Sequence, residues 1–386
     1  MKFYLVGGFV RDLYLGKIPN DRDFVVVGAT PEEMVAQGYT QVGLDFPVFL
    51  HPVSGDEYAL ARIERKVGIG HTGFTTEFQP TVSLEQDLYR RDFTMNAMAI
   101  PVDSLDADGT PHYTYSNDTI IDPFGGKQDL DNKTIRHVSE AFAEDPLRIL
   151  RACRFAARYK FQVHTTTWGL MVRMVHRGDL DHLEMYRVWK ELSSALMTNH
   201  PDNFFYELER CGALHAVFPE LLGGSVDVTK GGYIFSDMSG CDYTLAVRFT
   251  MIATKFGTDL ATYKRYKVPN VCSQLAIVYN AHGHQVVEYP DYTAAEKVKF
   301  LTQIGGLGKF RKTTMFSDFV EVYTEHCASH LPYMYFDAMR AAMADRSMLL
   351  AADVSKVVEQ FAGSKTMGQH IADHYINLLE SKSHVD

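Results

Sequence analysis

The fold of this chain is constrained most by a change of sequence pattern near residue 139. Before that point, short apolar runs alternate with turn signals and short helical patterns, which is typical of a mixed sheet covered by helices. After it, long amphipathic stretches rich in Leu, Ala, Arg and Met predict helices. The chain is therefore predicted to be of the α+β class, with its sheet in the first part and mainly helices behind it.

The same pattern predicts three regions. The chain of 386 residues is long enough for two or three domains. We place the sheet-containing region at 1–137, a first helical region at 138–224 and a helical tail at 225–386. The second boundary rests on closely spaced glycines, at 223–224 and 231–232, which break regular structure.

The amino-acid composition limits the partners and the cellular compartment that we expect for this chain. There are 48 acidic and 38 basic residues, so indiscriminate binding to nucleic acid is not expected, although a local basic patch could still hold an RNA. The five cysteines are scattered and form no CxxC pair, which favours reduced thiols and a cytoplasmic protein. No segment sustains 18 apolar residues, so neither a membrane span nor export is expected.

Local signals locate the first elements. Residues 3–6 read as a strand, Gly7-Gly8 as a tight turn and 9–14 as a helix. Residues 24–27 read as a second, buried strand. Thr30 and Glu33 then form a capping box that opens the next helix.

Asp21 and Asp23 stand immediately before the second strand. Strand residues two apart point to the same side, so both carboxylates face one site. Such a pair suits Mg²⁺, which takes few protein carboxylates and completes its ligands with substrate phosphates. Alone, the pair fits a solvated acidic turn equally well. A third carboxylate would be Glu57 or Glu64, between which the sequence does not choose.

The turn at 7–12 strengthens the metal interpretation. It ends one strand and opens a helix, so its backbone N–H groups and the positive helix end form an anion site. Arg11 would add a forked pair of hydrogen bonds. An ordinary turn that uses glycine for its conformational freedom is the alternative.

Two further turns carry polar residues. At 90–97 a basic pair precedes another apolar run, and Arg91 is placed to reach triphosphate oxygens or a ribose. At 122–126 Asp122 opens a turn that either braces the join between the two parts or is a plain β-turn.

The most informative segment spans 144–155. If it is one helix, Asp145 and Arg148 lie side by side as a carboxylate acceptor and a guanidinium donor. Cytosine and adenine both offer an amino donor beside a ring-nitrogen acceptor, whereas guanine and uracil would place a carbonyl oxygen against the carboxylate. The pattern predicts selection of C and A without a template. An intrahelical ion pair is the alternative.

A basic face follows that segment. Between 148 and 190 there are nine basic residues and three acidic ones, and Arg148, Arg151, Arg154 and Arg158 share one helical face. This predicts a surface that contacts RNA phosphates, with a merely solvated face as the alternative.

In order and spacing, six short motifs resemble the motif series of class II tRNA nucleotidyltransferases, the CCA-adding enzymes. They are GGFVRD at 7–12, DRD at 21–23, RRDFTMNA at 90–97, DPFGG at 122–126, EDPLRILRACRFAARY at 144–159 and RVWKEL at 187–192. The resemblance covers about residues 1–225 and implies a polymerase-β-type nucleotidyltransferase head followed by helical neck, body and tail.

The resemblance also implies roles for individual residues. Asp21 and Asp23 are expected to bind magnesium and carry catalysis. The incoming nucleotide is expected to be held by Gly8, Arg11 and Arg91, its base read by Asp145 and Arg148, and further triphosphate or RNA contacts made by Arg151 and Arg154. Residues 65–74, with three glycines, look like the family's mobile loop.

The tail departs from many bacterial relatives, which carry an HD phosphohydrolase domain. Thr254 and Lys255 stand where the His-Asp metal pair would be, and a hydroxyl and an ammonium cannot replace those ligands. We therefore predict a degenerate HD-like tail that lacks phosphohydrolase activity.

The expected reaction is template-independent addition of C, C and A from CTP and ATP to the 3' end of tRNA, with release of pyrophosphate. Two alternatives stay open. One is a poly(A) polymerase of the same superfamily, which would share the head motifs. The other is a non-catalytic RNA-binding module with a relict head.

Overall fold

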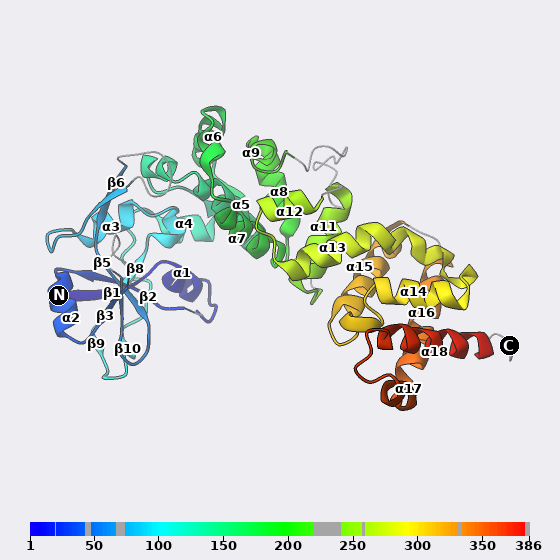
Figure 1. Cartoon of the computed structure of the whole chain (residues 1–386). Helices are drawn as coiled ribbons and strands as arrows, with labels where there is room; N and C mark the ends of the chain where they lie inside the picture. Colours follow the sequence, from blue (N-terminus) through cyan, green and yellow to red (C-terminus); the bar gives the residue numbers. More distant parts are fainter. Residues whose placement is uncertain are drawn as a thin grey trace. The chain divides into compact units, whose positions relative to one another are not determined.

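The computed structural model describes residues 1–19, 21–42, 48–66, 74–219, 241–256, 259–330 and 334–382. They divide into two compact units. The first unit comprises residues 1–191 and 203–217, and the second comprises 192–202 and 218–386. Figure 1 colours both units along the sequence. The predicted boundaries at 137 and 224 stay a prediction.

The first unit is built on a six-stranded mixed sheet in the order β3-β4-β5-β2-β1-β8. Strand β1 runs antiparallel to β2 and β8, and β2 runs parallel to β5. Shorter pairs are β9 with β10, β11 with β12, and β6 with β7. The strands are β1 (Lys2–Val6), β2 (Asp23–Val27), β3 (Thr40–Val42), β4 (Val48–Leu50), β5 (Glu57–Leu60), β6 (Ile63–Lys66), β7 (Phe74–Glu77), β8 (Ala99–Pro101), β9 (Ser104–Leu105), β10 (Pro111–His112), β11 (Thr134–Ile135) and β12 (Gln162–Val163).

Helices flank this sheet and continue the unit beyond it (Figure 1). The helices from α1 to α9 are α1 (Gly8–Tyr14), α2 (Pro31–Ala36), α3 (Leu84–Tyr89), α4 (Gly126–Asp131), α5 (Leu147–Tyr159), α6 (Thr165–His176), α7 (Met185–Leu196), α8 (Pro201–Arg210) and α9 (Ala213–Val217). Short 3-10 turns are η1 (Thr94–Asn96), η2 (Glu140–Glu144) and η3 (Asp179–His182). Residues 192–196 of α7 and 201–202 of α8 belong to the second unit.

Local sequence signals account for the first elements of this unit. The alternating and apolar runs form β1 and β2, and their side chains join a buried cluster made of Val6, Val25, Ala61, Val82, Leu88, Ala97 and Ala99. The predicted capping box is confirmed, since the Thr30 hydroxyl accepts from the Glu33 N–H and the Glu33 carboxylate accepts from the Thr30 N–H. The α+β prediction, with a mixed sheet in front of helices, is confirmed.

The second unit is helical in its described residues. Its helices are α11 (Leu245–Phe256), α12 (Leu260–Arg265), α13 (Asn270–His282), α14 (Ala294–Gln303), α15 (Met315–His330), α16 (Met334–Ala351), α17 (Ser355–Gln360) and α18 (Met367–Lys382), with 3-10 segments η7 (Gly283–Asp291) and η8 (Gly308–Phe310). Helix α11 packs on α13 and α15. No described helix has both the length and the apolar character needed to cross a membrane.

A buried arginine fixes the start of α11. Arg248 is only 4% exposed, and its guanidinium donates to the carbonyls of Leu196 and Thr198 at 2.8 and 2.9 Å and to that of Cys241 at 2.6 Å. These are charge-assisted bonds, which are stronger than bonds between neutral groups. The arginine therefore ties α11 to the end of α7 within the second unit.

Replacing Arg248 with methionine is expected to lower the free energy of unfolding by about 2–4 kcal/mol, because buried carbonyls lose their donors. Urea unfolding followed by circular dichroism measures the loss. Arg340→Met is the matched control, since Arg340 pairs with Asp337 on an exposed helix surface and should cost under about 0.5 kcal/mol. Equal stability of the two variants would show that the Arg248 bonds contribute nothing.

Two predicted features lie outside the described residues. Positions 67–73 of the predicted mobile loop are among them, and so are the glycine pairs of the predicted second boundary.

Candidate active site

The strand register brings the glycine turn to the aspartate pair. Val6 pairs with Asp23, so the turn at Gly7 begins beside the first residue of β2. A Cβ on Gly7 would lie 4.0 Å from Asp23 Oδ2 and 3.0 Å from Arg91 Nη1, and Gly7 has a φ of +68°. The positive φ therefore favours glycine at this position, and a Cβ here would crowd the end of the Arg91 side chain. Three predicted pieces, the turn, Asp23 and Arg91, meet at one place.

The aspartate pair has the electrostatics of a cation site. Asp23 lies at the surface, yet desolvation raises its pKa, the neighbouring Asp21 carboxylate raises it further, and Arg91 lowers it. A divalent cation would relieve the repulsion between the two carboxylates. Among the described residues, no three His, Cys, Asp or Glu side chains gather as a metal site. A pair of carboxylates that leaves other positions open is what Mg²⁺ bound to a phosphate substrate needs, so the donor set fits that ion.

The register also separates the two candidates for a third carboxylate. Glu57 in β5 pairs with Asp23 in parallel register, so the two side chains leave neighbouring strands on the same side of the sheet. The side chain of Glu64 is not among those that the structure describes. Glu57 is thus the candidate that the sheet places beside the pair.

Arg91 is held by a carboxylate that the sequence analysis missed. Asp87 in α3 is fully buried and accepts from Arg91 Nη2 at 3.2 Å and from Arg90 at 2.8 Å. Arg91 Nη1 also reaches the Asn96 carbonyl at 3.5 Å. Burial opposes the charge of Asp87, but the two arginines outweigh it and lower its pKa. Asp87 therefore aims Arg91 at the turn and the aspartate pair.

Arg11 is more enclosed than the sequence predicted. Only 5% of the residue is exposed, with Nη1 donating to Asn96 Oδ1 at 2.6 Å and Nε to Asp12 Oδ1 at 2.9 Å. Its guanidinium stacks near the rings of Phe155 and Tyr159, at 5.3 and 5.2 Å. Arg11 Nη2 lies 3.3 Å from the position of a Cβ on Gly8. The Arg11 side chain supports the turn, and Nη2 is the Arg11 atom that lies nearest to Gly8.

A chain of polar contacts continues from Arg11 to α5. Asn96 Nδ2 donates to Asp92 Oδ1 at 3.0 Å, and Arg151 of α5 donates to Asp92 Oδ2 at 2.6 and 2.8 Å. Burial alone would raise the pKa of Asp92, but Arg151, the amide of Asn96 and Arg148 together lower it to about 2. The carboxylate stays ionised and connects the turn to α5.

The chain ends on α7. Arg154 donates to Glu191 at 2.5 Å, and Arg151 lies 3.7 Å from the same carboxylate. Asp92, Asn96 and Glu191 were not predicted as site residues. All three stand inside the motifs quoted above, and a buried polar residue within an apolar run is the signal that would have found them.

The predicted helical pairing of Asp145 with Arg148 is wrong. Helix α5 begins at Leu147, and Asp145 has φ −118° and ψ 102°, which is extended backbone. Pro146 explains the difference, because a proline disfavours helical geometry for the residue before it. Asp145 instead pairs with Arg187 of α7 at 2.8 Å.

Arg148 remains close to this carboxylate in sequence but has its own partners. Its Nη1 donates to the Ala141 carbonyl at 2.9 Å and its Nη2 to the Arg90 carbonyl at 2.8 Å. Arg148 thereby joins α5 to the segment that carries Arg91.

The predicted basic face is engaged with carboxylates of the chain itself. Arg151 pairs with Asp92, Arg154 with Glu191, and Arg158 approaches Asp12 at 3.8 Å. These arginines therefore contribute to the arrangement of the site. Contact with RNA phosphates stays a prediction.

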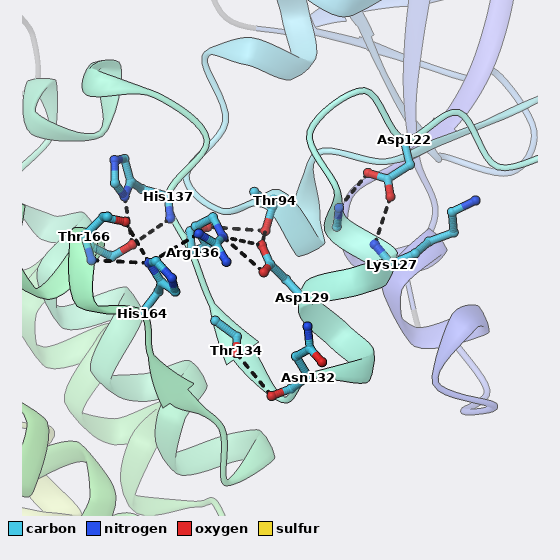
Figure 2. A network of polar contacts seen from close by, with 12 residues as sticks. Thr94, Asp122, Lys127, Asp129, Asn132, Thr134, Arg136, His137, His164 and Thr166 are labelled. Carbon is cyan, nitrogen blue, oxygen red and sulfur yellow. Dashed lines mark hydrogen bonds and ion pairs between the residues drawn. The ribbon is translucent and has the colours of Figure 1, made fainter.

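A second network of polar contacts reaches the η1 turn through Thr94 (Figure 2). Asp129 is 3% exposed and accepts from the Thr94 hydroxyl at 2.7 Å and from Arg136 Nε at 3.0 Å. Arg136 also lies 3.3 Å from a ring nitrogen of His164. The Thr94 N–H donates to the Arg136 carbonyl at 2.9 Å. These contacts hold the turn that contains Asn96.

Asp122 has a local role in the same view. Its carboxylate accepts from the backbone N–H groups of Gly126 and Lys127 at 2.7 and 2.9 Å, so it caps α4 (Figure 2).

Two family models match consecutive parts of the chain. Residues 3–136 match the family described as the poly A polymerase head domain, and residues 160–223 match a probable RNA and SrmB-binding site of polymerase A. A multifunctional CCA protein from Acinetobacter baumannii strain SDF is 56% identical over 279 residues, covering 68% of this chain and 64% of the relative. The same protein from strain ATCC 17978 is 56% identical over 224 residues, covering 57% of this chain and 51% of the relative. The chain thus spans about half to two thirds of the length of these relatives.

Solved structures extend the likeness over nearly the whole chain. A Thermotoga maritima CCA-adding enzyme complexed with tRNA matches with a TM-score of 0.63 and 21% identity, over 98% of this chain and 87% of that one. A Bacillus stearothermophilus CCA-adding enzyme in complex with CTP matches with a TM-score of 0.62 and 22% identity, over 98% and 89%. At this identity the likeness concerns the fold. With its motifs in one site and these relatives, the chain belongs to the nucleotidyltransferase family that carries the poly A polymerase head domain and includes the CCA-adding enzymes.

Proposed function

We propose that this protein adds C, C and A to the 3' end of tRNA from CTP and ATP, without a template, and releases pyrophosphate. The observation that carries the proposal is the convergence of Gly7, Asp23 and Arg91 on one place. The polar chain through Asp92 and Arg151 connects that place to α5. The relatives named as CCA proteins support the same reaction.

In this proposal Asp21 and Asp23 would hold Mg²⁺, which when bound neutralises charge on the α-phosphate and the leaving pyrophosphate and makes the 3'-hydroxyl more acidic. The backbone around Gly8 and the guanidinium of Arg91 bind the triphosphate. Arg11 keeps the turn in shape through Asn96 and Asp12. Catalysis comes mainly from positioning and charge.

The base is read at the start of α5. Asp145 accepts from the exocyclic amino group that cytosine and adenine share, and Arg148 donates to the adjacent ring nitrogen. Arg151 and Arg154 would add contacts to the triphosphate or to the RNA. The extended backbone of Asp145 does not prevent this, since Arg148 N–H bonds the Asp145 carbonyl at 3.0 Å and keeps the two residues adjacent.

The proposal also covers the cellular compartment and the roles of the three predicted regions. We place the reaction in the cytoplasm, which the five free thiols support. Residues 1–137 would act as the head, 138–224 as the neck and body that contact tRNA, and 225–386 as a degenerate HD-like tail.

The test uses a tRNA that lacks its last three nucleotides. With Mg²⁺, CTP alone should extend it by two residues, ATP alone should give almost no product, and both together should extend it by three. A gel that resolves single nucleotides reads the result.

Poly(A) polymerase is the second candidate, because the matched head domain is named for that activity. A long adenosine tail made from ATP alone, without use of CTP, would establish it in place of CCA addition. The relict-head alternative predicts no incorporation with any nucleotide.

Asp145→Ala is expected to lower the preference for CTP over UTP by about tenfold to a hundredfold, because one acceptor that distinguishes the bases is lost. Triphosphate affinity should change less than about threefold, since the triphosphate lies elsewhere in the site. Initial rates with each nucleotide over a range of concentrations give both quantities. An unchanged CTP/UTP preference would contradict the assignment of Asp145 as a base reader.

A further inference from the structure

The carboxylate of Asp145 is held from outside its own segment. Arg187 Nη2 donates to Asp145 Oδ2 at 2.8 Å and Nη1 to Oδ1 at 3.3 Å, and the Leu147 N–H donates to Oδ1 at 3.2 Å. Both charged side chains are 21% exposed. A forked pair of this kind fixes the plane of a carboxylate and not only its distance.

Asp145 needs such a support because it lies outside α5. It occupies the extended position between η2 and the helix, where no helical neighbour restricts its side chain. A base reader must hold its acceptor in one orientation, since a rotation of the carboxylate plane would let it meet other donor patterns. Within its own segment, the Asp145 side chain accepts from the Leu147 N–H at Oδ1, whereas Oδ2 accepts from Arg187.

Arg187 is itself well placed to act as the support. It lies four residues before Glu191 in α7, so the two side chains share one face of that helix. Glu191 is 5% exposed and pairs with Arg154 and Arg151 of α5. One turn of α7 is thus fastened to α5 by Glu191, and the adjacent turn presents Arg187 to Asp145, two residues before α5.

The pair leaves Asp145 able to accept. An ionised carboxylate has about four lone-pair sites. The forked pair uses one on each oxygen and the Leu147 N–H uses the second on Oδ1, so one site on Oδ2 remains. An amino group can donate to that site, whereas a carbonyl oxygen from guanine or uracil would meet a second acceptor.

We propose that Arg187 is a positioning residue that sets base selectivity by fixing the plane of the Asp145 carboxylate. The inference rests on the proposed CCA addition. It gives α7 a part in base selection that acts through Asp145, without direct contact between Arg187 and the base.

The test measures kcat/KM for CTP and for UTP on the trimmed tRNA, with the original protein, Arg187→Met and Arg187→Lys. Arg187→Met is expected to lower the CTP/UTP ratio by about five- to tenfold. Arg187→Lys should give an intermediate ratio, because an ammonium keeps the charge but cannot form the forked pair. A purely structural loss would lower both kcat/KM values together and leave their ratio unchanged.

Arg210→Met is the matched control. Arg210 pairs with Glu207 within α8 of the same unit, so its loss should leave the ratio as it was. Circular dichroism and the unfolding midpoint establish that each variant is folded. If Arg187→Met does not fold, Arg187→Lys alone decides the inference.

The outcomes separate the two proposals. If the original protein adds no cytidine to the trimmed tRNA, the proposed function fails whatever the variants do. If it adds cytidine and both Arg187 variants keep the original CTP/UTP ratio, the positioning role is wrong and the proposed function stands.

Discussion

Asp23→Asn is expected to reduce nucleotide incorporation by about 10³-fold or more, because under the proposed function Mg²⁺ would lose one of the two carboxylates that hold it at the reacting phosphate. Asp21→Asn should behave alike. Incorporation of radiolabelled CTP into trimmed tRNA, at saturating Mg²⁺, measures the loss.

The free energy of unfolding should not fall along with the activity of Asp23→Asn. Desolvation and Asp21 raise the pKa of Asp23, so the fold disfavours the ionised form of this residue. Replacing it with a neutral amide should leave the free energy of unfolding unchanged or slightly increased. Lost activity with retained stability distinguishes a functional carboxylate from a structural one.

The control for Asp23→Asn is Asp106→Asn, at an exposed carboxylate that pairs with His112 on the β9–β10 ladder of the same unit. Its activity should match the original protein. Incorporation by Asp23→Asn within tenfold of the original would contradict a metal site at the aspartate pair.

Asp92→Asn is expected to cost about 2–3 kcal/mol of stability at pH 7. The carboxylate is 8% exposed and its pKa in the folded protein is about 2, against an ordinary value of 3.8. A pKa lowered by folding stabilises the protein above the ordinary value, and about 1.4 kcal/mol follows for each unit of the difference. Urea unfolding of both proteins at pH 7 measures this loss.

The same shift predicts a pH dependence with a definite sign. Between about pH 4 and pH 2 the unfolded chain takes up the Asp92 proton before the folded protein does, so this contribution is lost on acidification. The stability difference between Asp92→Asn and the original protein should therefore shrink as pH falls below 4. A difference that stays constant from pH 7 to pH 3 would contradict the role of the ionised carboxylate.

Asp179→Asn is the matched control for this series. Asp179 is partly exposed and pairs at 2.7 Å with the exposed Arg177 of the same unit. Its loss should cost under about 0.5 kcal/mol, because exposed ion pairs contribute little.

Much of the first unit followed from local sequence signals. Strand β1, the glycine turn, strand β2 and the capping box at Thr30 are set by residues within a few positions of one another. The sequence analysis linked the glycine turn to the aspartate pair as one site, and the antiparallel register of β1 and β2 accounts for the approach of Gly7 to Asp23.

The partners of the charged residues did not follow from the sequence. Arg151 meets Asp92 across 59 positions and Arg187 meets Asp145 across 42, so these pairs depend on how helices pack. The sequence indicated that arginines gather on α5 but not that acids of the chain engage them. The backbone of Asp145 is a different case, because Pro146 is a local signal against a helix at the residue before it, and we did not use that signal.

A competition among all four nucleotides tests most directly whether protein side chains alone choose the base. Trimmed tRNA is incubated with the purified protein, Mg²⁺ and equal concentrations of ATP, CTP, GTP and UTP, and the 3' ends are sequenced. The expected product ends in C, C and A, with G and U rare at each added position. Ends with the four nucleotides in similar proportions, or with a run of adenosines, would contradict base selection by Asp145 and Arg148 beside the Asp21–Asp23 pair.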